Sequence, residues 1–435
     1  MKISLSAIVL LLLSKGLLLE AQEITLKPAG KLQLRYEDAT KKYTKLGQAV
    51  HNKNKLEYND YIVGGMFGVQ ALWESYTLKT LLYSVGRLHS KNENSLKNEK
   101  SFYNNNQDEF IYLGELSLTK EFDKHAITLG RQTYNTPLVN SNFRVTQNAY
   151  EGVSYYYDNE NVNFKTLYFH KISSSTMSNN IPINHKYGFL GYGLGYNTSG
   201  YAKLSKHIIN EDLSTNGAIH FLSSYKTKNS TISYENLYVD NFFNTSNLTV
   251  GYNFKSIYFK AGMIYQTSVG KKQVEHAIEN TQEGKKLEAQ HYQAQIKYQE
   301  GTFQLIYNVS LTPTNKNSIY RGTLLSPFSN QPTWLVGLNT SHATIADTLS
   351  QKVAVIKSTH IYDVPVVVAV AHIHYDIGKD NGLTPKSIST SESFFHLKGH
   401  LTKNLSAMLQ YSYAKNYDLL TEGSYHTKMV LEYQF

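Results

Sequence analysis

The fold is decided by an alternating stretch in the second half of the chain, Tyr292-Gln293-Ala294-Gln295-Ile296-Lys297-Tyr298-Gln299. Aromatic or apolar residues occupy one face of this segment and polar residues the other, which is the period of a β-strand with one apolar face. After Glu300-Gly301, a connection of tight-turn length, the alternation resumes over residues 302–310, with Ile306 as the exception. These two segments therefore predict a β-hairpin with one apolar and one polar face.

The same alternation recurs along the chain, for example at 257–266 and 405–413. The segments run for about ten residues, the length that a tilted strand needs to cross a membrane. A soluble β-sandwich would have shorter strands and an apolar face rich in Val, Ile and Leu. These apolar faces instead carry tyrosine near their ends, which is typical of an aromatic girdle at the membrane interfaces. The pattern favours a membrane barrel over a sandwich.

Short turns alternate with long polar connections along the chain. The short turns lie at 158–161, 226–230 and 403–404, and the long connections at 40–59, 89–108, 171–187, 269–289 and 311–331. Outer-membrane barrels have short periplasmic turns on one side and long extracellular loops on the other. The connections of this chain therefore predict short periplasmic turns and long extracellular loops.

The alternating segments give about 19 or 20 candidate strands, of which Tyr187–Asn197 and Thr333–His342 are the weakest. Because bacterial single-chain barrels have an even number of strands, we expect about 18, within a range of roughly 16 to 20. Barrels of about 16 to 18 strands enclose water rather than a filled core. The predicted fold class is all-β, a transmembrane antiparallel up-and-down β-barrel with an aqueous lumen.

The N-terminal residues have the order of a secretory signal peptide. Met1-Lys2 supplies a positive charge, residues 3–13 form an apolar core, and Leu19-Glu20-Ala21 offers a weak cleavage site. We expect residues 1–21 to be the signal peptide and residues 22–435 to form a single transmembrane β-barrel domain with periplasmic turns and long extracellular loops.

The remaining chain contains no run of 18 apolar residues, which argues against a helical membrane protein because a helix needs roughly 20 to cross a bilayer. Its last segment alternates, with Tyr433 and Phe435 on the apolar face. A terminal aromatic strand resembles the signature by which outer-membrane barrels are recognised for insertion. Together with the export signal, it predicts the outer membrane of a Gram-negative bacterium.

The chain is basic, with 43 Lys and Arg against 34 Asp and Glu and a formal net charge of +9. Its lysines are scattered and often fall in polar loops such as 91–100. No basic helix or nucleic-acid motif accompanies them. Most of this charge is therefore expected to belong to solvated lysine-rich loops. Contact with anionic solutes or lipid headgroups is the alternative, and no nucleic-acid partner is expected.

The selectivity of a channel depends on the side chains that narrow its lumen. The candidate constriction runs from Gly130 to Gly152, between the predicted strands 124–129 and 153–157. Two of the five arginines of the chain, Arg131 and Arg144, fall within it. Such a concentration makes this segment the best candidate for a loop that reaches into the pore.

This segment resembles the third loop of the OprD-like outer membrane porin family. In that family a Gly-Arg-Gln strand end is followed by an Asn/Asp-Thr-Pro-Leu turn, an arginine and an aromatic-x-Gly strand start. The matching residues here are Gly130, Arg131, Gln132, Asn135, Thr136, Pro137, Leu138, Arg144, Tyr150, Glu151 and Gly152. The segments 64–70 and 76–83 also look like the second and third strands of the family.

The resemblance covers nearly the whole chain after the signal peptide and implies an 18-stranded barrel with an infolded third loop. It also implies a row of basic side chains that guides carboxylate-bearing solutes such as amino acids or small organic acids. The sequence departs from the family at Asn142-Phe143-Arg144, where an aspartate usually precedes the arginine, and at Val145-Thr146-Gln147, where a Leu-Leu-Pro step usually follows. These differences affect the charge of the constriction.

The candidate lumen and constriction residues are Arg35, Arg131, Arg144, Arg321, Asn135, Pro137 and Asn142. Arg35 shares a strand face with Lys31, Gln33 and Glu37, which predicts that it faces the lumen. Strict alternation instead places Arg131 on the lipid side, unless a bulge or the end of the strand reorients it. For each arginine the alternative is a cation that faces solvent or lipid headgroups.

His372 and His374 are two residues apart, and we expect them to share the lumen face of a strand. No third ligand follows at a predictable spacing, so we expect solvated histidines and no metal site. Enzymatic barrels need a Ser/His or Asp/His pair, and no such pair stands in a recognisable motif. We therefore expect no catalytic residues, no cofactor and no enzymatic activity.

The sequence predicts an outer-membrane porin, a passive diffusion channel for small polar or anionic solutes such as amino acids, small peptides or organic acids. Its partners would be such carboxylate-bearing solutes and outer-membrane lipid, and it would be a monomer or a homotrimer. The first alternative is an adhesin or other surface interaction barrel that acts through its loops. The second, an outer-membrane hydrolase, has less support.

Overall fold

The structure is a computed structural model that describes residues 24–435 except for a set of shorter segments. The segments outside the described residues are 46–47, 50–51, 53, 91–108, 142–144, 174–200, 210–212, 273–285, 330–331, 339, 383–385 and 417–420. The predicted signal peptide also lies outside the described residues. Among the residues that the structure describes, no helix is both long and apolar enough to cross a membrane.

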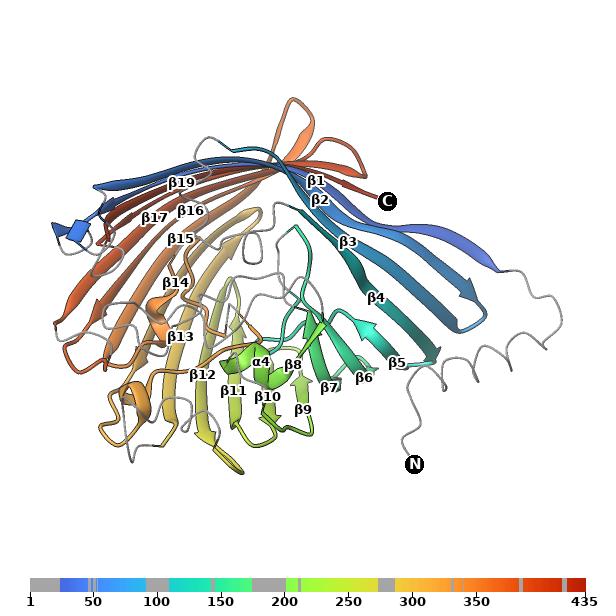
Figure 1. The fold of residues 1–435 in the computed structure, drawn as a ribbon, viewed down its shortest axis with the longest axis horizontal. Helices are drawn as coiled ribbons and strands as arrows, with labels where there is room; N and C mark the ends of the chain where they lie inside the picture. Colours follow the sequence, from blue (N-terminus) through green and yellow to red (C-terminus); the bar gives the residue numbers. More distant parts are fainter. Residues whose placement is uncertain are drawn as a thin grey trace.

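Antiparallel strands make up most of the described chain (Figure 1). Their bounds are β1 Thr25–Tyr43, β2 Lys55–Trp73, β3 Tyr76–Ser90, β4 Glu109–Phe122, β5 His125–Gln132, β6 Ala149–Asp158, β7 Val162–Ser173, β8 Tyr201–Lys203, β9 Ala218–Lys226, β10 Ser230–Val239, β11 Phe243–Phe254, β12 Ile257–Ser268, β13 Glu288–Glu300, β14 Phe303–Thr312, β15 Thr348–Ile361, β16 Val364–Ile377, β17 Ile388–His400, β18 Leu405–Lys415 and β19 Thr421–Gln434. The helical segments are α4 Leu204–Ile209, η1 Ile319–Gly322 and η2 His342–Thr344.

The strands form a closed ring. Neighbouring strands pair in antiparallel register, and β1 pairs with β19 from Lys31 to Tyr43, which closes the sheet. In Figure 1 the blue β1 lies beside the red β19. Strand β7 pairs directly with β9, while the three-residue β8 pairs only with the end of β7. The barrel therefore has 18 strands, as predicted, and β8 is an extra short strand at its rim.

The two weakest strand candidates have different outcomes. Residues 333–338 and 340–342 belong to the connection between β14 and β15 and form no strand, although η2 begins at His342. Residues 187–197 lie outside the described residues. The candidate strand Thr333–His342 is therefore absent from the barrel.

The connections differ in length at the two ends of the barrel. At one end they are short, and Tyr362 and Asp363 join β15 to β16 with φ of 48° and 65°. Two consecutive residues with positive φ are the mark of a type I′ hairpin turn, whose twist matches that of the strands. At the other end lie longer connections, including 133–148 and 313–347. The described residues thus show short and long connections at opposite ends of the barrel; the predicted connections 89–108, 171–187 and 269–289 lie largely outside the described residues.

The outward face of the barrel is apolar and the inward face polar. Leu32 and Leu34 on β1 are exposed on the outside, whereas Gln33, Arg35 and Glu37 between and beyond them are buried on the inside. The same alternation holds on β13 and β14. An apolar belt outside and polar side chains inside are the organisation of a transmembrane β-barrel, and the predicted fold class is confirmed.

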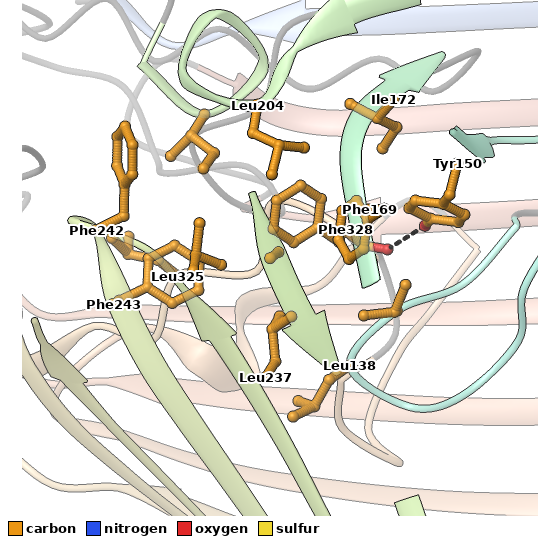
Figure 2. Packing of buried hydrophobic residues seen from close by; sticks show 14 of the residues in the cluster. Leu138, Tyr150, Phe169, Ile172, Leu204, Leu237, Phe242, Phe243, Leu325 and Phe328 are labelled. Carbon is orange, nitrogen blue, oxygen red and sulfur yellow. Dashed lines mark hydrogen bonds between the residues drawn. The ribbon is translucent and has the colours of Figure 1, made fainter. Parts of the chain in front are cut away.

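Two connections fold into the barrel, which we call the third loop (residues 133–148, between β5 and β6) and the seventh loop (residues 313–347, between β14 and β15). They meet strands β7 and β9–β11 and helix α4 in one buried apolar cluster. Figure 2 shows Phe328 of the seventh loop against Phe169 of β7, with Leu204 of α4 nearby. This sector of the lumen is therefore a packed core, and the infolded third loop is confirmed.

Candidate functional site

The third loop is held at its first half by a hydrogen-bonded chain that reaches into β9 and β10. The Tyr134 hydroxyl lies 3.0 Å from His220 Nδ1, and His220 Nε2 lies 2.9 Å from Glu235 Oε1. The backbone N–H of Leu138 donates to the same oxygen at 2.9 Å, and Asn247 Nδ2 donates to Glu235 Oε2 at 3.1 Å. We call Tyr134, His220 and Glu235 the loop anchor.

Every member of the loop anchor is nearly inaccessible to solvent. Burial, with a smaller contribution from the Glu235 carboxylate, raises the pKa of the Tyr134 phenol, so that the hydroxyl keeps its proton. The partners assign the proton positions: Tyr134 donates to Nδ1 of His220, and Nε2–H of His220 donates to Glu235. A buried polar network whose members are all satisfied holds one geometry, so the loop is fixed relative to the wall.

The second half of the third loop crosses to other strands. Val145 packs against Ile62 of β2 and Val85 of β3 in a buried apolar group. Between its two attachment points the loop meets the seventh loop, where Asn140 N–H donates to Phe328 O at 3.0 Å. The third loop thus extends along the inside of the barrel from β10 to β2 and narrows the lumen.

The seventh loop is fixed to the inner wall by side chains of several strands. Gln266 of β12 makes two hydrogen bonds with the backbone of Leu325, at 2.8 and 2.9 Å. Gln293 of β13 accepts from the backbone N–H of Trp334 at 3.0 Å. Each glutamine lies on the inward face of its strand, where alternation places it. The loop therefore lines β12 and β13 from within.

Glu392 of β17 holds the far end of the seventh loop. Its carboxylate accepts the backbone N–H groups of Leu338 at 3.1 Å and Thr340 at 2.9 Å, and the Thr340 hydroxyl at 2.6 Å. A carboxylate that accepts several donors is a strong anchor, because charge-assisted hydrogen bonds are stronger than neutral ones. Together the third and seventh loops contact the inner wall at one point on β2 and β3, and along β7 and β9–β17.

Charged and polar side chains line the remaining inner face, from β17 through β18, β19 and β1 to β3. We call this face the polar wall; its members are Lys31, Gln33, Arg35, Glu37, Asp60, Arg87, His396, Lys398, Gln410, His426, Lys428 and Glu432. They form rows across the strands: His396 lies opposite Gln410, Gln410 opposite Lys428, and Lys428 opposite Glu37. The polar wall faces the part of the lumen that these loops leave uncovered.

Arg35 lies on the polar wall, on the inward face where its alternation places it. The side chain is only 2% exposed. Its Nη1 lies 3.3 Å from Glu37 Oε1, and its Nη2 donates to Gln33 Oε1 at 3.3 Å. His426 approaches the other oxygen of Glu37 at 3.5 Å. Arg35 is thus held in an ion-pair network within the wall, and its part in a constriction remains a prediction.

Other cations of the polar wall are more accessible. The side chain of Lys31 is 15% exposed and lies 3.0 Å from Glu432. Lys398 and Lys428 are partly exposed on β17 and β19. These lysines, with Arg35 and Arg87, give the wall five lysine or arginine residues against the three carboxylates of Glu37, Asp60 and Glu432. The wall therefore carries an excess of positive charge.

The remaining candidate residues lie in different places. Asn135 and Pro137 are exposed in the third loop, and Arg321 lies in η1 of the seventh loop with φ of 56°. Arg144 and Asn142 lie outside the described residues. The structure thus brings Asn135, Pro137 and Arg321 into the two infolded loops, and their contact with solute remains a prediction.

Arg131 lies at the end of β5, opposite Leu116 of β4 and Glu151 of β6. Directly opposed residues share a face, and Leu116 is exposed on the outside of the barrel. By register Arg131 shares the face of Leu116, but its guanidinium turns to the end of the sheet, where it contacts Glu151 at 2.9 Å and stacks on the ring of Tyr201 at 4.3 Å. Its part in a constriction remains a prediction.

The expectation that His372 and His374 face the lumen is wrong. On β16 the inward residues are Ile373 and Tyr375, which pack against the seventh loop in a buried apolar group. The histidines lie on the outward face, where His372 contacts Ser393 at 2.8 Å and His374 contacts Asp376 at 2.9 Å. The alternation was correctly assigned, but the lumen here is filled by a loop, so the apolar face points inward.

The loop anchor, Glu392 and the lysines of β17 and β19 were not among the predicted site residues. The alternation of the strands places their inward residues inside the barrel. It does not distinguish an inward residue that binds a loop from one that is solvated. Within the described ranges, no group of three or more His, Asp or Glu side chains could hold a metal ion.

No family model and no curated protein sequence matches the chain. The solved structures that match include OccK2 (OpdF) of Pseudomonas aeruginosa in complex with glucuronate, at a TM-score of 0.66 and 10% identity over 94% of this chain and 96% of that one. OpdK of the same species with vanillate matches at 0.65 and 11% identity, over 93% and 98%.

A BenF-like porin from Pseudomonas fluorescens Pf-5 matches at a TM-score of 0.67 and 11% identity, over 94% of this chain and 98% of that one. At such low identities the similarity shows the fold. The chain has the OprD-like porin fold, as its third-loop motif indicated. The proteins that share this fold here are porin channels.

Proposed function

We propose that this barrel is a passive diffusion channel of the Gram-negative outer membrane for small polar solutes that carry a carboxylate. The observation that supports it best is that the lumen of the closed 18-stranded barrel is divided into a part filled by loops and a part lined by the polar wall. Infolded loops cover most of the inner wall, and the polar wall, with its excess of cations, faces the remainder. Residues 1–21 would serve as the export signal.

Positive charge along a channel favours anionic solutes. Field lines concentrate in a narrow passage with low-dielectric walls, so a net excess of lysine and arginine raises the local concentration of anions. The interspersed carboxylates of Glu37 and Glu432 keep the excess small. Weak attraction suits a conducting channel, because a solute must enter readily and also leave.

The ligands named for two structural neighbours fit this solute class. Glucuronate and vanillate, which accompany OccK2 and OpdK, are both small carboxylates. Both carry hydroxyl groups as well, which Gln33 and Gln410 of the polar wall could bind through their amides. We infer a similar size and charge of solute for this chain, with Arg35 and Arg144 as candidate contacts.

The proposed function is tested by reconstituting the purified protein in a planar bilayer. Discrete conductance steps and a reversal potential that indicates anion preference are expected in a salt gradient. Small carboxylates added to one side should carry current or reduce the conductance, and small amines of equal size should do so less. A barrel that inserts but gives no conductance steps would contradict the proposal and favour a surface interaction barrel.

Neutralising two lysines of the polar wall is expected to weaken anion preference. In a Lys398→Gln/Lys428→Gln variant the wall loses its excess of cations, so the reversal potential should move towards zero or to the cation side. Lys403→Gln, in the exposed turn after β17, removes the same kind of charge outside the lumen and serves as the control. Equal reversal potentials for the double variant and wild type would argue against the polar wall as the selective surface.

A further inference from the structure

An apolar groove of about 650 Å³ crosses the outside of the barrel, near the end that carries the short turns. Its floor follows one row of directly opposed residues on β1, β19, β18, β17 and β16: Leu34, Leu431, Ala407, Gly399 and Val366. Residues opposed in register point to the same side of a sheet, and Leu34 is exposed on the outward face. The groove, which we call the outer groove, is therefore separate from the lumen and from the proposed channel.

The hairpin of β15 and β16 forms one side of the outer groove. Strand β15 pairs with β14 only as far as Lys357, whereas its pairing with β16 continues to Ile361 and Val364, so the hairpin tip extends beyond β14 (Figure 1). Gly399 of β17 has no side chain, and a Cβ there would lie 3.2 Å from Val366 Cγ1 and 3.4 Å from Val364 Cγ1. The two valines therefore pack over Gly399, and Val366 is only 7% exposed although it points outward.

The outer groove is continuous with the lipid-facing belt of the barrel. Its accessible lining is almost entirely apolar, and Leu34, Met429 and Leu431 within it are 47%, 49% and 42% exposed. Hydrocarbon fills such a hollow in preference to water, because water finds no hydrogen-bond partner there. The row of the floor crosses five strands, or roughly 19 Å at about 4.8 Å per strand spacing. An acyl chain spans about half of the ~30 Å hydrocarbon core, so one chain fits along the groove.

Two residues of opposite charge flank the outer groove at its short-turn end. Lys403 lies in the turn between β17 and β18, two positions after the lining residue Leu401, and Asp363 lies at the hairpin tip, next to the lining residue Tyr362. The two turns are neighbours, because β16 and β17 pair directly. Both side chains are exposed, and neither forms an ion pair with another residue that the structure describes. Lys403 can therefore donate to a phosphate oxygen, and Asp363 can accept from an ammonium group.

A zwitterionic phospholipid carries the three groups that these features fit: an acyl chain, a phosphate and an ammonium group. The short-turn end corresponds to the periplasmic leaflet, and strand ends lie at headgroup level. We propose that the outer groove and its two flanking turns bind one such phospholipid of the periplasmic leaflet. One acyl chain lies along the row from Leu34 to Val366, the phosphate meets Lys403 and the ammonium group meets Asp363. The lipid then covers the seam between β1 and β19 at which the ring closes.

The test measures binding of palmitoyl-oleoyl phosphatidylethanolamine to the delipidated barrel in detergent by native mass spectrometry. Wild type should bind one lipid saturably. Ala407→Phe fills the floor of the outer groove and should weaken binding by about tenfold or more, the loss expected when two methylene groups of the chain are displaced. Ala294→Phe, at an exposed position on the lipid face of β13, makes the same change away from the groove and should bind as wild type. An unchanged circular dichroism spectrum shows that each variant has folded.

Two substitutions in the turns test the headgroup contacts. Lys403→Gln should weaken binding of the same lipid about fivefold, the effect of one cation near a phosphate. Asp363→Asn keeps a side chain that suits the φ of 65° in this turn, and it should weaken binding roughly twofold to fivefold. Binding of phosphatidylglycerol, which has no ammonium group, should be the same for Asp363→Asn and wild type. Lys228→Gln, in the exposed turn between β9 and β10, is the control and should bind as wild type.

The outcomes distinguish the phospholipid from other occupants of the outer groove. Equal binding by wild type, Ala407→Phe and Lys403→Gln would overturn the proposal, and so would a wild type that binds no lipid. Wild-type dimers that Ala407→Phe abolishes would overturn it in favour of a second copy of the chain. Glycerophosphoethanolamine, the headgroup without acyl chains, should not compete at concentrations where the lipid saturates, and full competition would contradict the role of the groove. None of these outcomes depends on whether the barrel conducts solutes.

Discussion

Replacing residues 134–147 with a short Gly-Ser linker is expected to raise the single-channel conductance several-fold and to remove size discrimination. The third loop extends inside the barrel from β10 to β2, so its removal should widen the lumen there. The strands would still pair as before, because their hydrogen bonds close the ring independently of the loop. Conductance in a planar bilayer, with solutes of graded size, measures the effect.

A single substitution in the loop anchor tests the same loop without removing it. Glu235→Ala removes the carboxylate that accepts from His220 and Leu138, so the first half of the loop loses its attachment. We expect noisy conductance with frequent transitions between levels rather than a uniformly wider pore. Glu57→Ala, at an exposed position on β2, is the control. Normal conductance in both the linker and Glu235→Ala variants would show that the third loop does not form the constriction.

Ile296→Arg is expected to destabilise the barrel by roughly 2–4 kcal/mol, the cost of placing arginine on the lipid face of a membrane barrel near the midplane. Ile296 is 47% exposed on the outside of β13 and lies between the outward-facing Tyr292 and Tyr298. Unfolding in urea from detergent or lipid vesicles measures the free energy.

Gln295→Arg, one residue away, is the matched control. Gln295 faces the interior, where it donates to Asn308 at 2.8 Å, so an arginine there enters a polar environment. Its effect on the free energy of unfolding should be much smaller. Equal losses for the two variants, or a larger loss for Gln295→Arg, would contradict the assignment of lipid and lumen faces.

The strands and their faces could be predicted because both follow from local chemistry. A strand between lipid and water must alternate, so Ile296 and Gln295 reveal their sides without knowledge of the rest of the chain. The even strand number followed from closure of the ring. The same rule placed Arg35 inside the barrel.

The content of the lumen could not be predicted in the same way. The loop anchor joins Tyr134 to His220, which is 86 positions away in the sequence, and no spacing rule connects them. The seventh loop folds inward because Gln266, Gln293 and Glu392 each accept or donate to its backbone, but many inward residues carry similar groups. The wrong prediction for His372 has the same cause, because the polar face of a strand points into the lumen only where the lumen holds water.

Pairing of β1 with β19 means that residues such as Gln33 and Glu432, about 400 positions apart, must meet before the ring is complete. Bringing two distant points together costs only slightly more entropy than closing a shorter loop, yet contacts of such long range make folding slow. Until β19 pairs with it, β1 therefore keeps a row of unpaired backbone N–H and C=O groups. Such an exposed edge can pair with other chains. Chaperones that shield this edge until the last strand arrives would accordingly govern the yield of assembled protein.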